Sequence, residues 1–228
     1  MEDHDGESPW ELLKLLFQAH PWHGVAIGAE APRVVTAYIE IVPTDTVKYE
    51  IDKPSGHLKV DRPQQFSNVC PTLYGLIPQT FCGQQVAAFG AAHEGGAPLA
   101  GDADPLDICI LSERSFSHGG ILLQAVPVGG LRLIDRNEAD DKIVAVLKGD
   151  AAFGHCAEIG DLPAALIERL KHYFLTYKRP PGAPGDAVQI TSVYGAAEAR
   201  EVIERSRADY EERYPRLKDR FLETLRKE

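Results

Sequence analysis

Asp102, Asp104 and Asp107 place three carboxylates within six residues, in the segment GDADPLDICI at 101–110. Carboxylates this close together repel one another and shift each other's pKa values unless cations lie between them. Their oxygen atoms are the ligands that hard divalent metal ions prefer. The cluster therefore predicts a metal site, with a solvated acidic turn as the simpler alternative. It does not fit an EF-hand calcium loop, which needs a glycine after its third acidic position and a later glutamate.

Pro105 determines the expected backbone geometry of this cluster. A proline fixes its own φ, lacks an N–H group and disfavours a helical conformation for the preceding residue, here Asp104. After it, Leu106, Ile108 and Ile110 occupy alternate positions, which is the pattern of a half-buried strand. We expect a rigid acidic turn that leads directly into a strand.

Further charged and hydroxyl side chains occur in segments that we expect to form strands, turns or helix ends: Glu40, Lys48, Glu50, Arg62, Asp135, Asp140, Lys142, Tyr177 and Lys178. Each one alone fits a solvated surface position. Together they indicate a mixed site, in which carboxylates hold metal ions while cations and hydroxyl groups bind an anion. No serine or cysteine lies beside a histidine–carboxylate pair in the sequence, so a covalent nucleophile is not indicated.

The composition is that of a globular protein with 228 residues, 44% hydrophobic and 25% charged, and a formal net charge of −10. This charge disfavours nonspecific binding to nucleic acid or to an anionic membrane. No apolar run approaches the ~20 residues of a membrane span, and the acidic start lacks a signal-peptide pattern. Cys70, Cys82, Cys109 and Cys156 form no C-x-x-C pair. We expect a reduced, cytoplasmic protein without a zinc site or a disulfide framework.

Alternating apolar residues predict strands at 34–42, 46–53, 57–62, 106–110, 121–135 and 142–148. Short strands separated by turn residues suggest an antiparallel meander or a barrel. Helices are expected from Ser8 to about Ala19, from Asp161 as cap to Lys178, and from 196 to 214. The HPWH segment at 20–23 is interpreted as a structural turn anchored by Trp22.

The Gly- and Ala-rich segment at 83–101 shows no clear periodicity, and we expect a mobile loop or insertion there. No internal repeat or linker is visible. The expected organisation is an N-terminal extension at 1–33, one catalytic domain at 34–214 and a charged tail at 215–228.

The chain resembles the soluble inorganic pyrophosphatases of family I in eight ordered matches. These are I-E-I at 39–41, K-Y-E-I-D-K at 48–53, V-D-R at 60–62, Y-G at 74–75, D-A-D-P-L-D-I at 102–108, P-V-G at 127–129, Asp135 with D-x-K at 140–142, and Y-K at 177–178. The resemblance covers residues 20–178. The agreement in order across this length makes coincidence a poor explanation.

The resemblance implies a mainly β fold with α-helices, a small closed OB-like β-barrel with the helices packed outside and the site in its mouth. It implies Mg²⁺-dependent hydrolysis of pyrophosphate to two phosphates. The implied metal ligands are Asp102, Asp107, Asp140, Asp135 and Glu40, and the implied general base is Asp104. The implied phosphate-binding residues are Lys48, Arg62, Tyr74, Lys142, Tyr177 and Lys178, with Glu50 as a supporting carboxylate. A homo-oligomer is expected, with a hexamer favoured and a dimer possible.

Three departures affect details of the pocket. Cys70 and Leu73 replace an expected aromatic residue and asparagine, the segment at 83–101 is long, and RPPGAPGD follows Lys178. Two alternatives therefore stay open: a hydrolase of another phosphoanhydride, and a metal- or phosphate-binding protein with weak or no catalysis. Asp104 speaks against the second, because a protein that only binds has no need of a carboxylate placed as a base.

Overall fold

The computed structural model describes residues 18–93, 95, 98–178, 188–215 and 223. The helix expected from Ser8 and most of the charged tail lie outside these residues, as does the departure after Lys178. In the described part of the chain, no helix is both long and apolar enough to cross a membrane.

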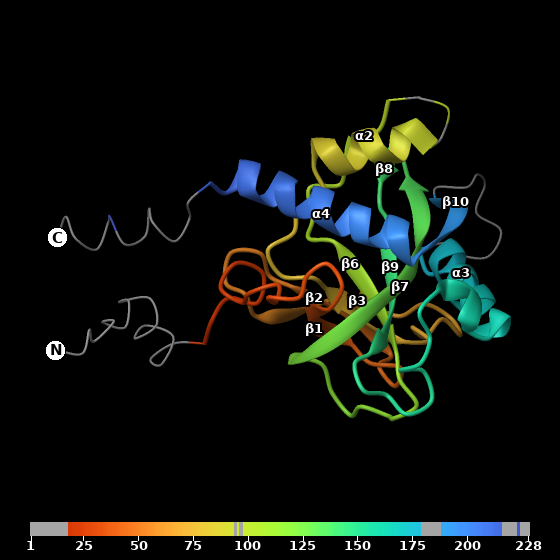
Figure 1. Cartoon of the computed structure of the whole chain (residues 1–228). Coiled ribbons are helices and arrows are strands. Elements are labelled where there is room, and N and C mark those ends of the chain that lie inside the picture. The colour runs from red at the N-terminus through yellow and green to blue at the C-terminus, as the bar shows by residue number, and fades with distance from the viewer. Residues whose placement is uncertain (1–17, 94, 96–97, 179–187, 216–222, 224–228) are drawn as a thin grey trace, which may run out of the picture.

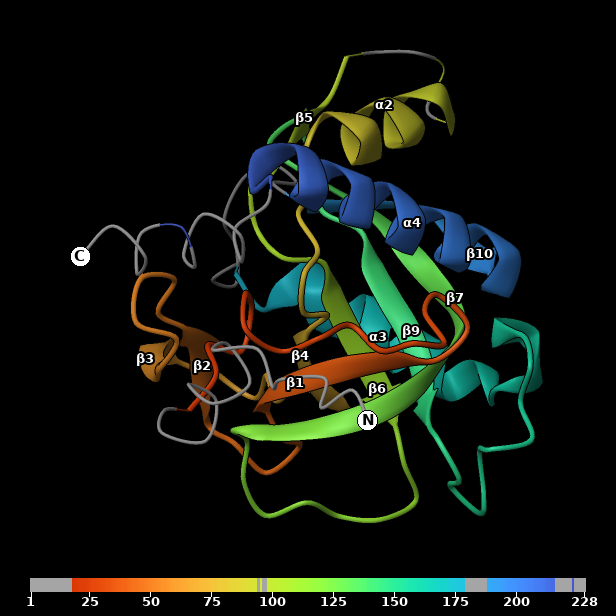
Figure 2. The same ribbon diagram turned by 60° about the vertical axis from the view of Figure 1, so that its left-hand side comes forward.

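Five strands close into a ring at the centre of the molecule (Figures 1 and 2). In ring order they are β1 (Val35–Ile41), β4 (Leu73–Leu76), β6 (Asp107–Leu111), β9 (Lys142–Leu147) and β7 (Ile121–Asp135). Antiparallel pairing of β1 with β7 completes the ring. The expected closed β fold with helices packed outside is confirmed, and so are the predicted strands at 121–135 and 142–148 to within one residue.

The long strand β7 pairs with several other strands of the sheet. Its first residues pair with β1, its centre pairs with β9, and its last residues pair with β10 (Val188–Gly195), a strand that the sequence did not predict. The register shifts between Pro127 and Gly129, as at a β-bulge. A Cβ atom on Gly130 would lie 2.3 Å from the Tyr194 ring, so glycine is what allows this ring to lie against the strand.

A separate two-stranded sheet lies beside the ring and is formed by β2 (Val47–Ile51) and β3 (Leu58–Pro63) (Figure 2). Both strands were predicted. Their antiparallel register places Lys48 opposite Arg62 and Glu50 opposite Lys59. The hairpin therefore carries a dense set of charges on short, defined strands.

Helix α4 (Ala196–Arg213) lies across the strands, and α2 (Gln84–His93) lies beside α4 (Figures 1 and 2). Short strands β5 (Ala100–Gly101) and β8 (Glu138–Ala139) pair below α2. Helix α3 (Ala164–Thr176) packs on a different part of the ring from α4. Neighbouring residues of the parallel pair β6 and β9 fill two cores: Ile108 and Ile143 pack with residues of α4, and Cys109 and Val144 pack with residues of α3.

The prediction of a structureless loop at 83–101 is wrong, because residues 84–93 form α2. The carboxylate of Asp209 on α4 accepts hydrogen bonds from the backbone N–H groups of Gly83, Gln85 and Val86. It thereby caps the start of α2, whose first N–H groups have no partner within the helix. A cap from a residue more than a hundred positions away leaves no local signal in the sequence.

The predicted start of the third helical region also needs correction. Asp161 ends a 3₁₀ turn, η1 (Ile159–Asp161), and α3 begins after it at Ala164. The Asp161 carboxylate accepts hydrogen bonds from the N–H groups of Ala157 and Glu158, so it closes the turn in place of capping the helix. Pro163 separates the two elements.

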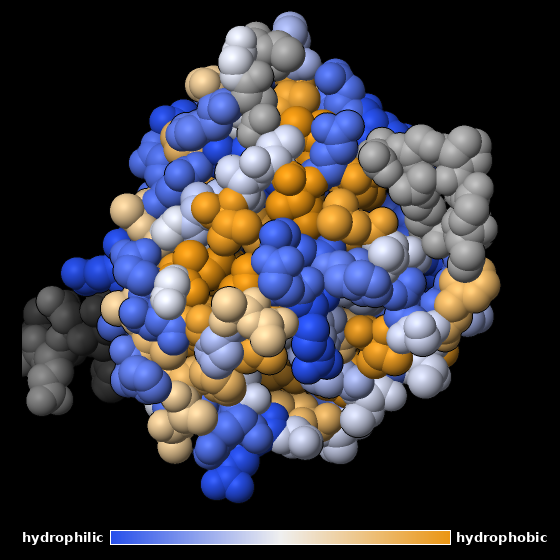
Figure 3. Space-filling model, turned by 90° about the vertical axis from the view of Figure 1, so that its right-hand side faces the viewer, coloured by the Kyte–Doolittle hydropathy of each residue, from blue (hydrophilic) through white to orange (hydrophobic). Residues whose placement is uncertain are grey.

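The face that carries α3 and β10 shows hydrophobic residues gathered among hydrophilic ones (Figure 3). Leu175 of α3 is 40% exposed, and Val193 of β10 is 43% exposed.

Candidate active site

One cavity of about 510 Å³ gathers every predicted site residue except Arg62. Its walls are rich in charge: the predicted lining residues are Glu40, Lys48, Glu50, Tyr74, Asp102, Asp104, Asp107, Asp135, Asp140, Lys142, Tyr177 and Lys178. The side chains come from β1, β2, β4, β6 and β9, from the ends of β7, β8 and α3, and from the acidic turn. The fold therefore brings together residues that are more than a hundred positions apart.

The parallel pairing of β6 and β9 explains the centre of this site. Asp107 and Lys142 are the first residues of their strands and lie directly opposite each other in the register. The Lys142 ammonium group contacts the carboxylates of both Asp107 and Asp140. Burial lowers the pKa of Lys142, but these two carboxylates outweigh that effect and keep its pKa well above the usual value. Lys142 is therefore a permanent cation between two proposed metal ligands.

Tyr74 supports Asp107 from the neighbouring strand β4. Its hydroxyl group donates a 2.6 Å hydrogen bond to Oδ2 of Asp107. Burial, and then the charge of Asp107, raises the pKa of Tyr74 well above its usual value. The hydroxyl group stays protonated and remains a donor at neutral pH.

Hydrogen bonds within the acidic turn and to Thr80 and Cys82 fix its conformation. The turn leads into β6 as predicted. The N–H group of Asp104 donates to Oδ1 of Asp102 over 2.9 Å, and Ala103 between them has a φ of 61°. The N–H of Cys82 donates to the carbonyl oxygen of Asp104, and Thr80 Oγ1 accepts from the N–H of Leu106. The Asp104 carboxylate lies in the cavity, where it contacts the ammonium group of Lys53.

Two carboxyl groups of the site, those of the buried Glu40 and the partly buried Asp102, have raised pKa values. Burial, and then the charge of Asp107, raises the pKa of Glu40 to about 8. Burial, and then the charge of Asp140, raises the pKa of Asp102 to about 8. Groups of this kind ionise at neutral pH when cations are supplied. The donor set is made of oxygen atoms, which fits hard divalent ions.

Lysine ammonium groups contact the carboxylates of Asp107, Asp140 and Asp135. The Lys178 ammonium group lies 2.6 Å from Oδ2 of Asp135, whose Oδ1 finds no hydrogen-bond partner in the described part of the chain. Among the described residues, no group of three or more His, Cys, Asp or Glu side chains is arranged to hold an ion as it stands. Divalent ions would therefore replace lysine contacts at Asp107, Asp140 and Asp135. The free oxygen of Asp135 is consistent with such an exchange.

Arg62 lies beside the cavity, not in its wall. Its guanidinium group is paired with Asp61, and its Cζ atom lies 5.5 Å from the centroid of the Tyr177 ring. Asp61 also accepts a 2.9 Å hydrogen bond from Lys48. The structure thus places Arg62 next to the Tyr177 ring, with Asp61 joining it to Lys48.

Sequence analysis did not assign a role to Lys53, Lys59 or Glu138, which also line the cavity. Lys53 belongs to the K-Y-E-I-D-K segment and was available as a candidate. The other two are placed by pairing: Lys59 lies opposite Glu50 on the hairpin, and β8 carries Glu138. Nothing in the local sequence distinguishes them from surface residues.

Comparison with known proteins gives one consistent result. A family model described as inorganic pyrophosphatase matches residues 37–211. The inorganic pyrophosphatase of Chlamydia caviae is 48% identical over 204 residues, covering 87% of this chain and 94% of that protein. The soluble inorganic pyrophosphatase of Zea mays is 34% identical over 188 residues, covering 82% of this chain and 78% of that protein. The crystal structure of inorganic pyrophosphatase from Thermus thermophilus is similar with a TM-score of 0.70 and 30% identity, covering 85% of this chain and 99% of that one.

Proposed function

The chain belongs to the inorganic pyrophosphatase family, and from this premise we propose how its acidic cavity carries out the reaction. The reaction is hydrolysis of the phosphoanhydride bond of pyrophosphate to two phosphate ions. One observation carries the proposal: carboxylates, lysines and tyrosines converge in a single cavity. Such a site can hold metal ions and a multiply charged phosphate at once.

Magnesium is the metal that we propose. The residues that would hold it are Asp102, Asp107 and Asp140, with Asp135 and Glu40 completing the set. The all-oxygen donors and the raised pKa values of Glu40 and Asp102, each about 8, support this choice. When bound, Mg²⁺ lowers the pKa of water and neutralises phosphate charge.

Asp104 is the proposed general base. Its carboxylate reaches the cavity from the acidic turn and lies between two proposed metal ligands in the sequence. It would take a proton from the attacking water. The contact with Lys53 keeps this carboxylate close to a cation. No covalent intermediate with the protein is needed.

The anion would be bound by cations and hydroxyl groups: Lys48, Tyr74, Lys142, Tyr177 and Lys178 of the cavity wall, and Arg62 beside it. Glu50 would orient Lys48, which donates to it over 3.0 Å. Preorganised positive charge stabilises the phosphate oxygens as charge develops in the transition state. If Asp107, Asp140 and Asp135 held metal, Lys142 and Lys178, which contact these carboxylates, would be available to bind the substrate.

The test is phosphate release from pyrophosphate in Mg²⁺, with ATP assayed in parallel and EDTA as control. We expect rapid release from pyrophosphate, little from ATP, and none from either with excess chelator. Preferential hydrolysis of ATP would favour another phosphoanhydride as the substrate. Binding of Mg²⁺ and phosphate without turnover would favour a binding protein of the same scaffold. Full activity in EDTA would contradict the metal assignment.

We also propose a homo-oligomer, with a hexamer favoured and a dimer possible, and a cytoplasmic location. The exposed Leu175 and Val193 on the α3–β10 face support self-association. The four cysteines are free and buried, which fits a reducing compartment. Light scattering at several protein concentrations tests the assembly, and a monomer at all of them would contradict it.

A further inference from the structure

Asp141 lies between two residues of the active site but points away from it. Asp140 and Lys142 line the cavity. Asp141 is 3% exposed and lies just before β9, with its carboxylate turned away from the cavity toward Arg132 and Tyr194. Its Oδ2 atom accepts a 3.0 Å hydrogen bond from the hydroxyl group of Tyr194 and lies 3.5 Å from Nη2 of Arg132.

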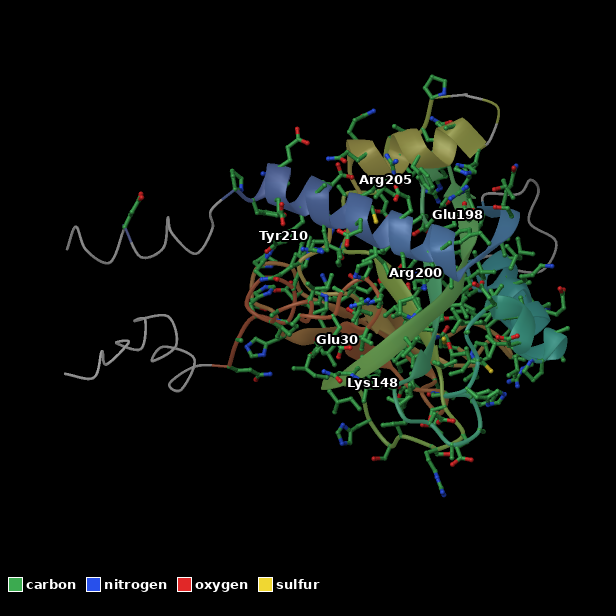
Figure 4. All side chains as sticks on the ribbon, viewed as in Figure 1. Glu30, Lys148, Glu198, Arg200, Arg205 and Tyr210 are labelled. Carbon is green, nitrogen blue, oxygen red and sulfur yellow. The ribbon has the colours of Figure 1, made fainter. Side chains whose placement is uncertain are left out.

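Arg132 of β7 is a fully buried cation, with 1% of its side chain exposed. Its guanidinium group lies against two aromatic rings, with Cζ 5.4 Å from the centroid of Phe89 on α2 and 5.1 Å from that of Tyr194 on β10. Its Nη2 atom also lies 2.8 Å from Glu198 of α4. Glu198 and Arg205 both extend from α4 on the side of α2 (Figure 4), and Arg205 covers the same Phe89 ring at 4.5 Å.

This buried pair is poorly suited to a purely stabilising role. Removing two charges from water is costly, and the cost is recovered only when their remaining hydrogen bonds are also made. Here Nε and Nη1 of Arg132 and Oδ1 of Asp141 find no hydrogen-bond partner among the described residues. An apolar pair of similar size would fill this space at lower cost. The presence of this buried pair is therefore better explained by the neighbouring residues whose position it fixes.

What the pair holds is the segment that carries Asp140 and Lys142. The N–H group of Asp140 donates to the carbonyl oxygen of Leu133 over 3.0 Å. Leu133 follows Arg132 on β7, so consecutive residues of β7 bind consecutive residues of the segment. The contact between Leu133 and Asp140 is made by backbone groups, and the contact between Arg132 and Asp141 is made by side chains. The Tyr194 hydroxyl group, which lies against Gly130, adds a third point of attachment.

We propose that Arg132 and Asp141 are positioning residues, which hold Asp140 and Lys142 in the geometry that the active site needs from the opposite face of the sheet. Neither residue touches the cavity. The inference rests on the proposed function, because it concerns the same metal and phosphate ligands. It adds that Arg132, a buried cation of β7, contacts α2, α4 and the segment that carries Asp140 and Lys142.

The test uses Asp141→Asn, Arg132→Lys and Arg132→Gln in the full chain. Two quantities are measured: the Kd for Mg²⁺ by calorimetry without substrate, and kcat and KM for pyrophosphate across a Mg²⁺ titration. For residues that orient metal ligands, we expect losses of roughly 10- to 100-fold in Mg²⁺ affinity or kcat. KM at saturating Mg²⁺ should change little. Arg132→Lys should recover part of what Arg132→Gln loses.

The matched control is Asp150→Asn. Asp150 is also a buried carboxylate, and it accepts hydrogen bonds from the N–H groups of Glu113, Ala152 and Phe153, away from the cavity. This variant should lower Tm without changing Mg²⁺ affinity or kcat. If it produced the same functional losses as Asp141→Asn, general destabilisation would explain both and the proposal would be overturned.

Tyr194→Phe covers the case in which the charge variants do not fold. It removes only the hydroxyl group that donates to Asp141 and should weaken Mg²⁺ binding in the same direction, by a smaller factor. Folded variants with wild-type Mg²⁺ affinity and wild-type kcat would overturn the proposal. A wild-type protein that neither binds Mg²⁺ nor hydrolyses pyrophosphate would instead contradict the proposed function, so the two failures are distinguishable.

Discussion

The hydroxyl group of Tyr74 donates a 2.6 Å hydrogen bond to Oδ2 of Asp107, and the Lys142 ammonium group contacts the same oxygen. Tyr74 lies on β4, and Asp107 is the first residue of the adjacent β6. Both contacts engage one end of the carboxylate. They orient a proposed metal ligand before any metal arrives, which reduces the reorganisation needed on binding.

Tyr74→Phe tests this orientation with minimal change in shape. The variant keeps the ring, which lies 6.0 Å from that of Phe174 between centroids, and loses only the hydroxyl group. We expect Mg²⁺ affinity or kcat to fall by roughly 10-fold, as for the loss of an outer contact to a metal ligand. Tm should stay near that of the wild type. Calorimetric titration with Mg²⁺ checks the first point, and an unchanged Kd with unchanged kcat would show that Lys142 alone orients Asp107.

Asp104→Asn should slow the chemical step without weakening metal binding. The amide keeps the size of the carboxylate but cannot accept a proton at neutral pH, and loss of a general base typically costs ~10²–10⁴-fold in kcat. We expect a decrease of that order, with little change in KM. The measurement is kcat across a Mg²⁺ titration.

Asp107→Asn is the comparison, because it removes a proposed ligand and should weaken metal binding itself. Excess Mg²⁺ should partly restore Asp107→Asn and leave Asp104→Asn slow. Recovery of Asp104→Asn at saturating Mg²⁺ would make Asp104 a ligand, and the base would then be another group of the cavity.

Asp209→Ala should destabilise α2. It removes the acceptor for the N–H groups of Gly83, Gln85 and Val86 at the start of the helix. Loss of a helix cap costs about 0.5–2 kcal/mol, and unpaired buried N–H groups add to it. At about 2–4 °C per kcal/mol for a chain of this size, Tm should fall by roughly 5 °C.

Hydrogen exchange should then accelerate at the amides of 84–90. Asp161→Ala is the control, since Asp161 accepts from Ala157 and Glu158 in an exposed turn and its loss should leave α2 unchanged. Equal exchange rates at 84–90 in wild type and Asp209→Ala would mean that packing on α4 alone maintains the helix.

His23 should make stability fall in acid. Burial, and then the charge of His20, lowers the pKa of His23 from 6.5 to about 4. Between pH 6.5 and 4 the unfolded chain therefore takes up a proton that the folded protein does not. The free energy of unfolding should decrease as pH falls through this range, by on the order of 1 kcal/mol given the partial exposure of the ring. Above pH 6.5 this group should have no effect.

His23→Phe keeps an aromatic ring beside Trp22 and removes the titration. Its unfolding free energy should depend less steeply on pH between 6.5 and 4 than that of the wild type, in saturating Mg²⁺. Identical slopes for wild type and His23→Phe would contradict the assignment.

Features that depend on neighbouring residues could be predicted from the amino-acid sequence. Pro105 and the alternation after it predicted the acidic turn and β6. Alternation also predicted β7 and β9, and Gly195 marked the start of α4. The ordered motifs were sufficient to recognise the family and thus the closed β fold. In each case the information is local, because strand and helix patterns repeat over a few residues.

Features that join residues far apart in the chain depend on how the elements pack in three dimensions. α2 depends on a cap from Asp209, and its Gly- and Ala-rich segment has no pattern of its own. Arg62 does not line the cavity wall; its guanidinium group pairs with Asp61 and lies 5.5 Å from the centroid of the Tyr177 ring. Arg132 looks like an ordinary strand residue in the sequence, and it becomes a buried cation only when Phe89, Tyr194 and Asp141 enclose it. Such positions are set by packing between elements far apart in the chain, which no local pattern records.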